Sequence, residues 1–248
     1  MSGHSKWSTI KRQKGAADAK RGQLFTKLAR EISIAAREGL PDPESNNRLR
    51  LAVDRAKANN MPKENIERAI QRASGTGSGD QFEEIFYEGY GPGGAALMIQ
   101  VQTDNRNRTV GEVRAALTRA GGTLGENGSV GWMFDQMGVI EISTASLDPD
   151  EVALVAIDAG ASDVEPEDDT VFVYTDPTEL HRTREALASA GFAVDGAQLT
   201  MRPKTLVAPE PHVAVKVIRL VEKLEDLDDV QEVFTNLDVS DEVLATAM

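Results

Sequence analysis

Cysteine is absent from the 248-residue chain, which excludes disulfide bonds, thiolate zinc sites and cysteine nucleophiles. The three histidines, His4, His181 and His212, lie far apart in the sequence, so we expect no histidine metal site. No apolar run approaches the roughly 18 residues that a membrane-spanning helix needs. The N-terminus also lacks the apolar core of a signal peptide. These absences predict a soluble, cytoplasmic protein that uses no metal or other cofactor and contacts no membrane.

Sequence signatures of common active sites are also missing. The chain has no P-loop, no H-E-x-x-H, no G-x-S-x-G and no EF-hand spacing. Acidic clusters at residues 165–169 and 222–229 fit solvated turns and helix ends better than a cation site. Because no nucleophile, base and orienting group stand out together, we predict that the protein is not an enzyme and name no catalytic residue. An enzyme or scaffold with a small-ligand site is the alternative.

Charge is distributed unevenly along the chain. Residues 1–73 carry 16 basic and 8 acidic residues, a net charge of +8, whereas the remainder carries 11 basic and 32 acidic residues, a net charge of −21. A basic head on an acidic body indicates a polyanionic partner for the head. The body would repel the same partner and so help to orient the protein on it. A solvated charged surface without a partner is the other interpretation.

The basic residues are densest near the N-terminus, where eight lysines and arginines lie between residues 3 and 30 against one acid, Asp18. Such side chains neutralise phosphates and release counterions. Trp7 could stack on an exposed base or anchor this segment on the helices, and we expect Phe25 to pack among the helices. The residues predicted to contact nucleic acid are Lys6, Trp7, Lys11, Arg12, Lys14, Lys20, Arg21, Lys27, Arg30, Arg48 and Arg50. Arg106 and Arg108 are secondary phosphate-binding candidates.

Apolar periodicity predicts three helices after an N-terminal arm, residues 1–17. In residues 18–38, Leu24, Leu28 and Ile32 share one face, whereas Lys27 and Arg30 fall on the opposite face, which we expect to stay free. Helices over residues 46–58 and from 62 onward repeat the spacing, which indicates a small bundle. The segment 75–79, Gly-Thr-Gly-Ser-Gly, is typical of a linker and of a domain boundary.

Strand-like runs follow the linker, at residues 84–90 and 95–103. The glycines between them match G-x-G-x-x-G, but they connect strand to strand, which indicates a hairpin and not a dinucleotide loop. A helix is expected over residues 107–120, capped by Asp104 or Thr109. Further strands are expected at 129–134 and 139–143.

From residue 139 the expected order is β-α-β-β-α-β, a ferredoxin-like unit. Its two helices each begin with an Asp-Pro-x-Glu segment, at residues 148 and 176, where aspartate would cap the helix. The C-terminal helix and strand would complete the block that precedes this unit. We therefore predict an α+β fold with a basic helical domain at 1–78. A discontinuous αβ domain would occupy 79–135 and 204–248, and the ferredoxin-like domain at 136–203 would be inserted into it.

Five tracts of the sequence resemble the YebC family. They are GHSKWSTIKRQKGAADAKRGQLFTKLAREI (3–32), NRLRLAVDRAKANNMPKENIERAI (47–70), YEGYGPGG (87–94), TDNRNRT (103–109) and GSVGWMF (128–134). The resemblance implies a three-domain cytoplasmic protein without catalytic activity. Bacterial members are usually described as DNA-binding transcriptional regulators. Relatives, including a mitochondrial translational activator, act on the ribosome and help translation of difficult sequences such as proline runs.

The residues and the resemblance together predict a monomeric, nucleic-acid-binding regulator of gene expression. Its partner is either DNA, in transcription, or ribosomal or transfer RNA, in translation on the ribosome. No helix-turn-helix reading helix is evident, and a basic arm suits the phosphate backbone of either polymer. This favours binding with low sequence specificity, and hence RNA or the ribosome.

Overall fold

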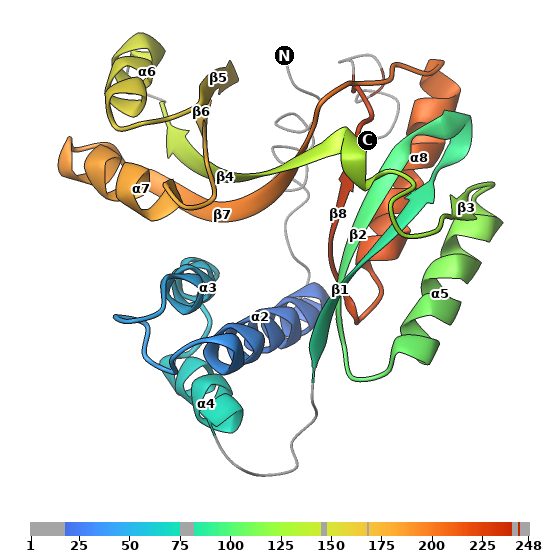
Figure 1. Cartoon of the computed structure of the whole chain (residues 1–248), viewed down its shortest axis with the longest axis horizontal. Coiled ribbons are helices and arrows are strands. Elements are labelled where there is room, and N and C mark those ends of the chain that lie inside the picture. The colour runs from blue at the N-terminus through green and yellow to red at the C-terminus, as the bar shows by residue number, and fades with distance from the viewer. Residues whose placement is uncertain (1–17, 75–81, 145–147, 168, 240–242, 244–248) are drawn as a thin grey trace.

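The computed structural model describes residues 18–74, 82–144, 148–167, 169–239 and 243, and Figure 1 shows a helical region beside two sheets. The helical region consists of α2 (Asp18–Glu38), α3 (Asn47–Ala58) and α4 (Lys63–Ser74). Its core holds the apolar positions that recur every three or four residues, such as Leu28, Ile32 and Leu49. The side chain of Asn46 accepts a hydrogen bond from the Leu49 amide at 3.0 Å and thereby starts α3.

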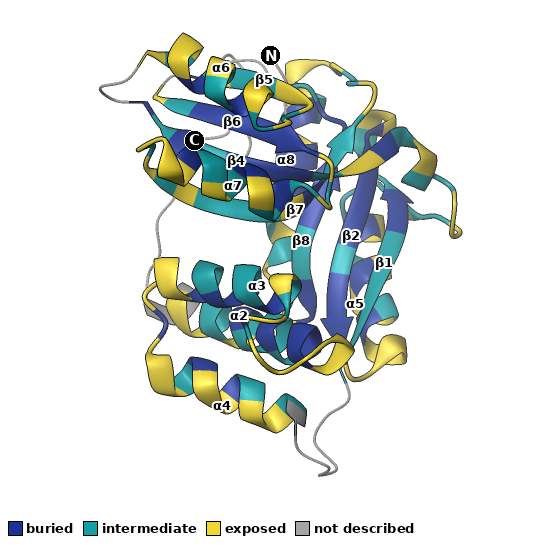
Figure 2. Ribbon diagram, turned by 60° about the vertical axis from the view of Figure 1, so that its left-hand side comes forward, coloured by how far each residue is buried: buried dark blue, intermediate teal, exposed yellow. Residues whose placement is uncertain are grey.

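The first sheet has the strand order β3-β1-β2-β8, with antiparallel pairs throughout. Its strands are β1 (Glu83–Tyr90), β2 (Ala96–Thr103), β3 (Thr123–Leu124) and β8 (Val230–Thr235). A 3₁₀ turn, Pro92–Gly94, joins β1 to β2, which confirms the predicted hairpin. Helices α5 (Arg106–Arg119) and α8 (Pro211–Glu225) pack on one face of this sheet. The buried faces of β2 explain its almost continuous apolar sequence (Figure 2).

The second sheet has the strand order β5-β6-β4-β7 and is also antiparallel. Its strands are β4 (Phe134–Ser143), β5 (Asp163–Glu167), β6 (Thr170–Thr175) and β7 (Val194–Pro203). Helices α6 (Pro149–Asp158) and α7 (Leu180–Ser189) occupy the two crossovers. The order β4-α6-β5-β6-α7-β7 is that of a ferredoxin-like unit.

The chain enters the second sheet after β3 and returns to the first sheet with α8 and β8, so one αβ unit is inserted into the other. The predicted α+β class and arrangement are therefore confirmed. The residue boundaries of the three domains stay a prediction, because β4 and β7 begin and end where the two units meet: Phe134 pairs with Pro203 and packs with Met98 and Phe234 of the first sheet.

Three local predictions were wrong. The strand expected at 129–134 is absent up to residue 133, because a 3₁₀ turn, Gly131–Met133, leads directly into β4, which begins at Phe134. The N-cap of α5 is Asn105, whose side chain accepts from the Arg108 amide at 3.1 Å. The segment beginning at Asp176 forms a turn before α7, so only the first of the two Asp-Pro segments caps its helix. Across the residues described, no helix is long and apolar enough to span a membrane.

Candidate nucleic-acid interface

Six of the eleven predicted contact residues cannot be placed. Lys6, Trp7, Lys11, Arg12 and Lys14 lie outside the described residues, and Lys20 belongs to α2 but its side chain is likewise outside them. Arg21 is exposed in the first turn of the same helix. The predicted role of these residues therefore stays a prediction.

The opposite face of α2 meets the C-terminal end of α8, where helical carbonyl groups have no partners within the helix. Lys27 donates from Nζ to the Glu225 carbonyl at 2.5 Å. Arg30 donates to the Asp228 carbonyl at 2.6 Å and to the Asp229 carboxylate at 3.1 Å. The expectation that this face stays free is thus wrong for Lys27 and Arg30. The cations compensate the negative end of the α8 dipole and a buried acid.

Asp229 is the centre of this contact, with a side chain only 2% exposed. Its carboxylate accepts hydrogen bonds from Thr103 at 3.1 Å, Thr109 at 2.7 Å and Arg108 at 2.6 Å. Burial alone would raise the pKa of Asp229, but these hydrogen bonds outweigh burial and hold the pKa below its usual range. Hydrogen bonds to Asp229 and then Asp104 raise the pKa of Arg108 further above its normal value.

The remaining described candidates also bind parts of the same chain. Arg106 pairs with Glu83, and Arg48 binds both carboxylate oxygens of Glu84 at 2.8 and 2.9 Å. Arg50 donates to the carbonyls of residues 43 and 44 and lies 2.8 Å from Nε2 of His181. In the structure, Arg48 therefore links the helical region to β1, and Arg50 links it to α7.

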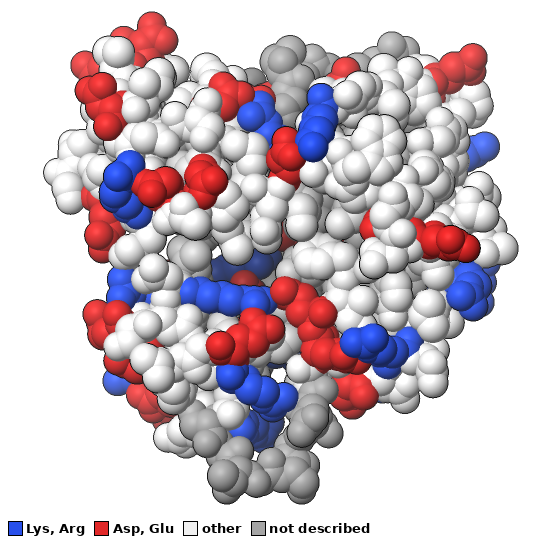
Figure 3. Space-filling view, in the orientation of Figure 1, with Lys and Arg blue, Asp and Glu red and all other residues white. Residues whose placement is uncertain are grey.

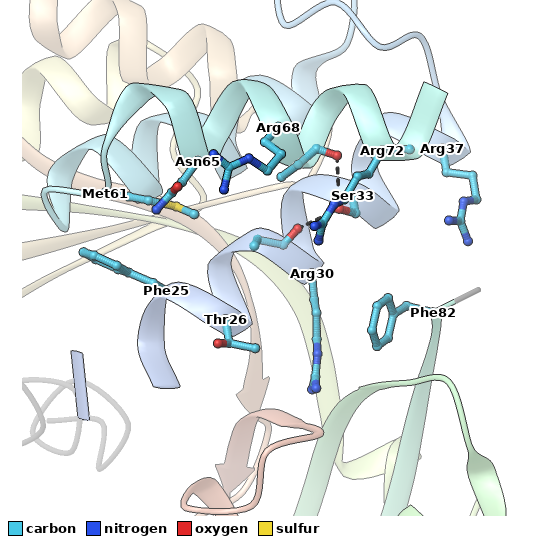
Figure 4. Close-up of a pocket in the computed structure, with 13 residues that line it drawn as sticks. Phe25, Thr26, Arg30, Ser33, Arg37, Met61, Asn65, Arg68, Arg72 and Phe82 are labelled. Atoms are coloured by element: carbon cyan, nitrogen blue, oxygen red, sulfur yellow. Dashed lines mark hydrogen bonds between the residues drawn. The ribbon is translucent and has the colours of Figure 1, made fainter. Parts of the chain in front are cut away.

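A groove between α2 and α4 presents arginines that the sequence analysis missed (Figure 4). Its volume is about 830 Å³, and Arg68 and Arg72 of α4 line it together with Phe25 and Phe82. Both arginines are exposed, and neither makes an ion pair or side-chain hydrogen bond within the described part of the chain. Their spacing of four residues on one helix was the signal in the sequence that could have identified them.

Two family profiles cover the chain. The N-terminal domain of TACO1/YebC proteins matches residues 5–76, and the second and third domains of TACO1/YebC proteins match residues 82–237. The chain belongs to the TACO1/YebC family. The resemblance to the YebC family is thereby confirmed.

Proteins similar to this TACO1/YebC chain include a "probable transcriptional regulatory protein" of Roseiflexus castenholzii, 58% identical over 98% of this chain and 97% of the relative. One of Geotalea uraniireducens with the same name is 51% identical over the full length of both chains. The crystal structure of a conserved hypothetical protein from Aquifex aeolicus, 47% identical, superposes with a TM-score of 0.85 over 92% of this chain and 94% of that one. The fold described above is thus the fold of a TACO1/YebC relative.

The geometry of the described residues suits binding of anions. No group of three or more histidine, aspartate or glutamate side chains among them is placed to hold a metal ion. The acidic run at 222–229 contributes Asp229 to the buried cluster and backbone carbonyls to α2. The groove, in contrast, offers guanidinium groups and aromatic rings to a ligand from outside.

Proposed function

We propose that this TACO1/YebC protein is a non-enzymatic, nucleic-acid-binding regulator of gene expression that acts as a DNA-binding transcriptional regulator. The observation that carries the proposal is the groove, where Arg68 and Arg72 face solvent without acidic partners among the described residues. All residues that line the groove except Phe82 belong to residues 1–73, which carry a net charge of +8. The curated relatives' name, probable transcriptional regulatory protein, supports the transcriptional role.

Acidic side chains outside the helical region also favour an orientation in which the helical region faces a polyanion. On the face seen in Figure 3, acidic residues mark the outer corner over α6, and basic and acidic residues lie side by side along the junction between the helices and the sheets. The region after residue 73 carries a net charge of −21 and would be repelled by phosphates. A nucleic acid would therefore meet the helical region first.

A translational role on the ribosome is the second candidate. It is favoured by the concave shape of the groove, because the DNA major groove is read by an element that inserts into it, such as a helix. The ligand would then be ribosomal or transfer RNA.

Cell fractionation distinguishes the two roles. Lysate is sedimented through a sucrose gradient, ribosome profiling is performed on a deletion strain, and genomic occupancy of the tagged protein is mapped. Occupancy restricted to promoters, without ribosome association, is expected for the transcriptional role. Co-migration with ribosomes and stalling at particular codons in the deletion strain would contradict the transcriptional role and support the translational role.

Binding assays with purified protein test nucleic-acid binding, which both roles require. We expect the protein to bind nucleic acid and expect Arg68→Ala with Arg72→Ala to weaken that binding. Lys63→Ala is the matched control, because Lys63 lies on the same helix but pairs with Glu67 at 3.5 Å and does not line the groove. Absence of binding to DNA and RNA would overturn the proposal, and so would a hydrolase activity that survives purification and depends on this chain.

A further inference from the structure

We propose that the groove between α2 and α4 binds an unpaired phosphodiester strand, with phosphates on Arg68 and Arg72 and bases against Phe25 and Phe82. The inference rests on the proposed function and goes beyond it, because it names the site and the single-stranded form of the ligand. The proposed ligand is a flexible polyanion with exposed base faces, and either RNA or DNA can supply such a strand.

Small side chains create the space. α2 and α4 approach closely, and Ser33 of α2 donates from Oγ to the Ala69 carbonyl of α4 at 3.2 Å. Ala29 and Ala73 also line the groove and fill little of it. The volume of about 830 Å³ lies in the roughly 300–1,000 Å³ range of ligand pockets. The groove is open to solvent, as a continuous strand requires.

The two arginines are spaced for consecutive phosphates. Arg68 and Arg72 lie four residues apart on α4, and a helix rises about 1.5 Å per residue, so they are about 6 Å apart along the axis. That rise is comparable to the distance between neighbouring phosphates of an extended strand. The planar guanidinium donates two parallel hydrogen bonds to a phosphate, which lysine cannot do.

Aromatic rings mark both ends of the groove in Figure 4: Phe25 extends from α2 below Met61, and Phe82 stands beside Arg30. The guanidinium of Arg30 lies 4.9 Å from the centre of the Phe82 ring. This cation–π contact helps to position the Phe82 ring at the edge of the groove. An unpaired base has a face available for stacking on such a ring, whereas bases in a duplex are stacked on each other.

The groove is bounded on one side by acids. Arg30 and Phe82 also line a second recess, of about 530 Å³, whose other residues include Asp104, Asp226 and Asp228. Arg30 is bound to Asp229 and compensates the charge of that one carboxylate. The acidic recess repels phosphates and confines the strand to the arginine side.

Fluorescence anisotropy with the full-length protein tests the inference. The probes are labelled oligonucleotides of about 10 nucleotides: an unpaired RNA, an unpaired DNA and a DNA duplex of the same sequence. We expect both unpaired strands to bind more tightly than the duplex. Arg68→Ala with Arg72→Ala should reduce the slope of log K against log salt for unpaired strands by about 1.4, from about 0.7 per lost phosphate contact. Lys63→Ala should leave that slope unchanged.

The aromatic contact has its own variants. Phe82→Leu should weaken binding of unpaired strands at least about fivefold more than binding of duplex, because stacking is lost. Phe82→Tyr, which keeps a ring, should recover most of that loss. Circular dichroism and thermal unfolding show whether each variant is folded, and the exposed double arginine variant tests the groove independently if Phe82→Leu does not fold.

The outcomes separate the inference from the function. Duplex binding as tight as strand binding, or equal losses for both in Phe82→Leu, overturns the inference and leaves the proposed function standing. An unchanged salt slope in the double arginine variant also overturns it. If none of the three probes binds, the proposed function and the inference fall together. Tighter binding of one unpaired polymer supports the inference and identifies RNA or DNA as the source of the strand.

Discussion

At the scale of single residues, Asp229 shows what the sequence could not reveal. It lies in an acidic run that we interpreted as a solvated helix end, yet its carboxylate is buried and accepts hydrogen bonds from four side chains. Arg108 and Thr109 donate from 121 and 120 residues away in sequence. Because an isolated buried carboxylate is costly, it occurs only where such donors converge. That convergence is a property of the fold and not of the local sequence.

Replacing Asp229 should therefore destabilise the protein. In Asp229→Asn the amide would direct N–H groups at Arg108 and the threonine hydroxyls, and hydrogen bonds to a charged acceptor would be lost. We expect the free energy of unfolding to fall by about 2–3 kcal/mol. Urea denaturation measures it. The matched control is Asp228→Asn at the neighbouring exposed position, for which we expect a change within about 0.5 kcal/mol. Equal effects of the two substitutions would contradict the assigned role.

Glu88 is a second buried carboxylate, 6% exposed, and it organises the loop that we predicted as a strand. It accepts hydrogen bonds from the backbone amides of Gly128 at 2.7 Å, Val130 at 2.6 Å and Gly131 at 2.7 Å. These amides are therefore unavailable for a strand ladder. We expected a strand here after the turn signal Asn127-Gly128, because a distant carboxylate that competes for the amides leaves no local signal.

The same carboxylates make stability depend on acid pH. Burial would raise the pKa of Glu88, but the three backbone hydrogen bonds outweigh burial and lower it, and Asp229 is also lowered. Both groups release protons more readily in the folded protein, so their stabilisation is complete above the ordinary pKa values of about 4.3 and 3.9. This stabilisation is lost as the pH falls from the ordinary pKa values through the lowered pKa values of the folded protein.

Unfolding free energy measured between about pH 6 and pH 3 checks this expectation. Glu88→Gln should lower stability by about 1–3 kcal/mol at neutral pH and should flatten the decline below pH 4.5. Glu126→Gln, at an exposed position in the same loop, is the control and should preserve the decline. A decline as steep in Glu88→Gln as in the unchanged protein would show that Glu88 does not titrate as argued.

At the scale of elements, the helices were predictable because their signals are local. Leu28, Ile32 and Ala35 are buried where the period of 3.6 places them, and the caps at Asn46 and Asp148 lie next to the helices that they start. The partner of the other face of α2 was not predictable. Lys27 and Arg30 bind groups 198 residues further along the chain, at the end of α8.

This contact between α2 and α8 should be measurable by hydrogen exchange. Arg30→Gln removes a cation that binds the Asp228 carbonyl and Asp229, so residues 225–229 should open more readily. We expect a loss of about 1 kcal/mol in local stability, equivalent to roughly fivefold faster amide exchange. Lys216→Gln is the control, because Lys216 is exposed on α8 away from its C-terminal end. Exchange that is equally fast in both variants would argue against a specific contact.

At the scale of the whole molecule, element order predicted the topology. A β-α-β-β-α-β order with right-handed crossovers leads to the strand order β5-β6-β4-β7, and a returning helix and strand complete the first sheet. The packing of the helical region against the two αβ units involves ion pairs such as Arg48 with Glu84 and Arg184 with Asp54. Nothing in their local sequence identifies those partners.

The basic residues of the N-terminal region consequently have two roles. We interpreted the basic N-terminal region wholly as a surface for a polyanion, but Lys27, Arg30 and Arg48 bind acidic or carbonyl groups of the protein's own body. Cations held in this way stabilise the arrangement of the domains and contribute little attraction to phosphates. Contacts with nucleic acid are then expected from the basic residues before α2 and from the groove.

Salt dependence separates the two groups of cations. Changing Lys6, Lys11, Arg12 and Lys14 to alanine should reduce the slope of log K against log salt by roughly 3–4 units, one contact per residue. Arg48→Gln should leave the slope unchanged and lower the free energy of unfolding instead, because Arg48 binds Glu84 at 2.8 Å. Filter binding across a salt series and urea denaturation provide the two readouts. An unchanged slope in the fourfold variant would remove the N-terminal segment from the interface, and a reduced slope in Arg48→Gln would show that phosphate displaces Glu84 from this arginine.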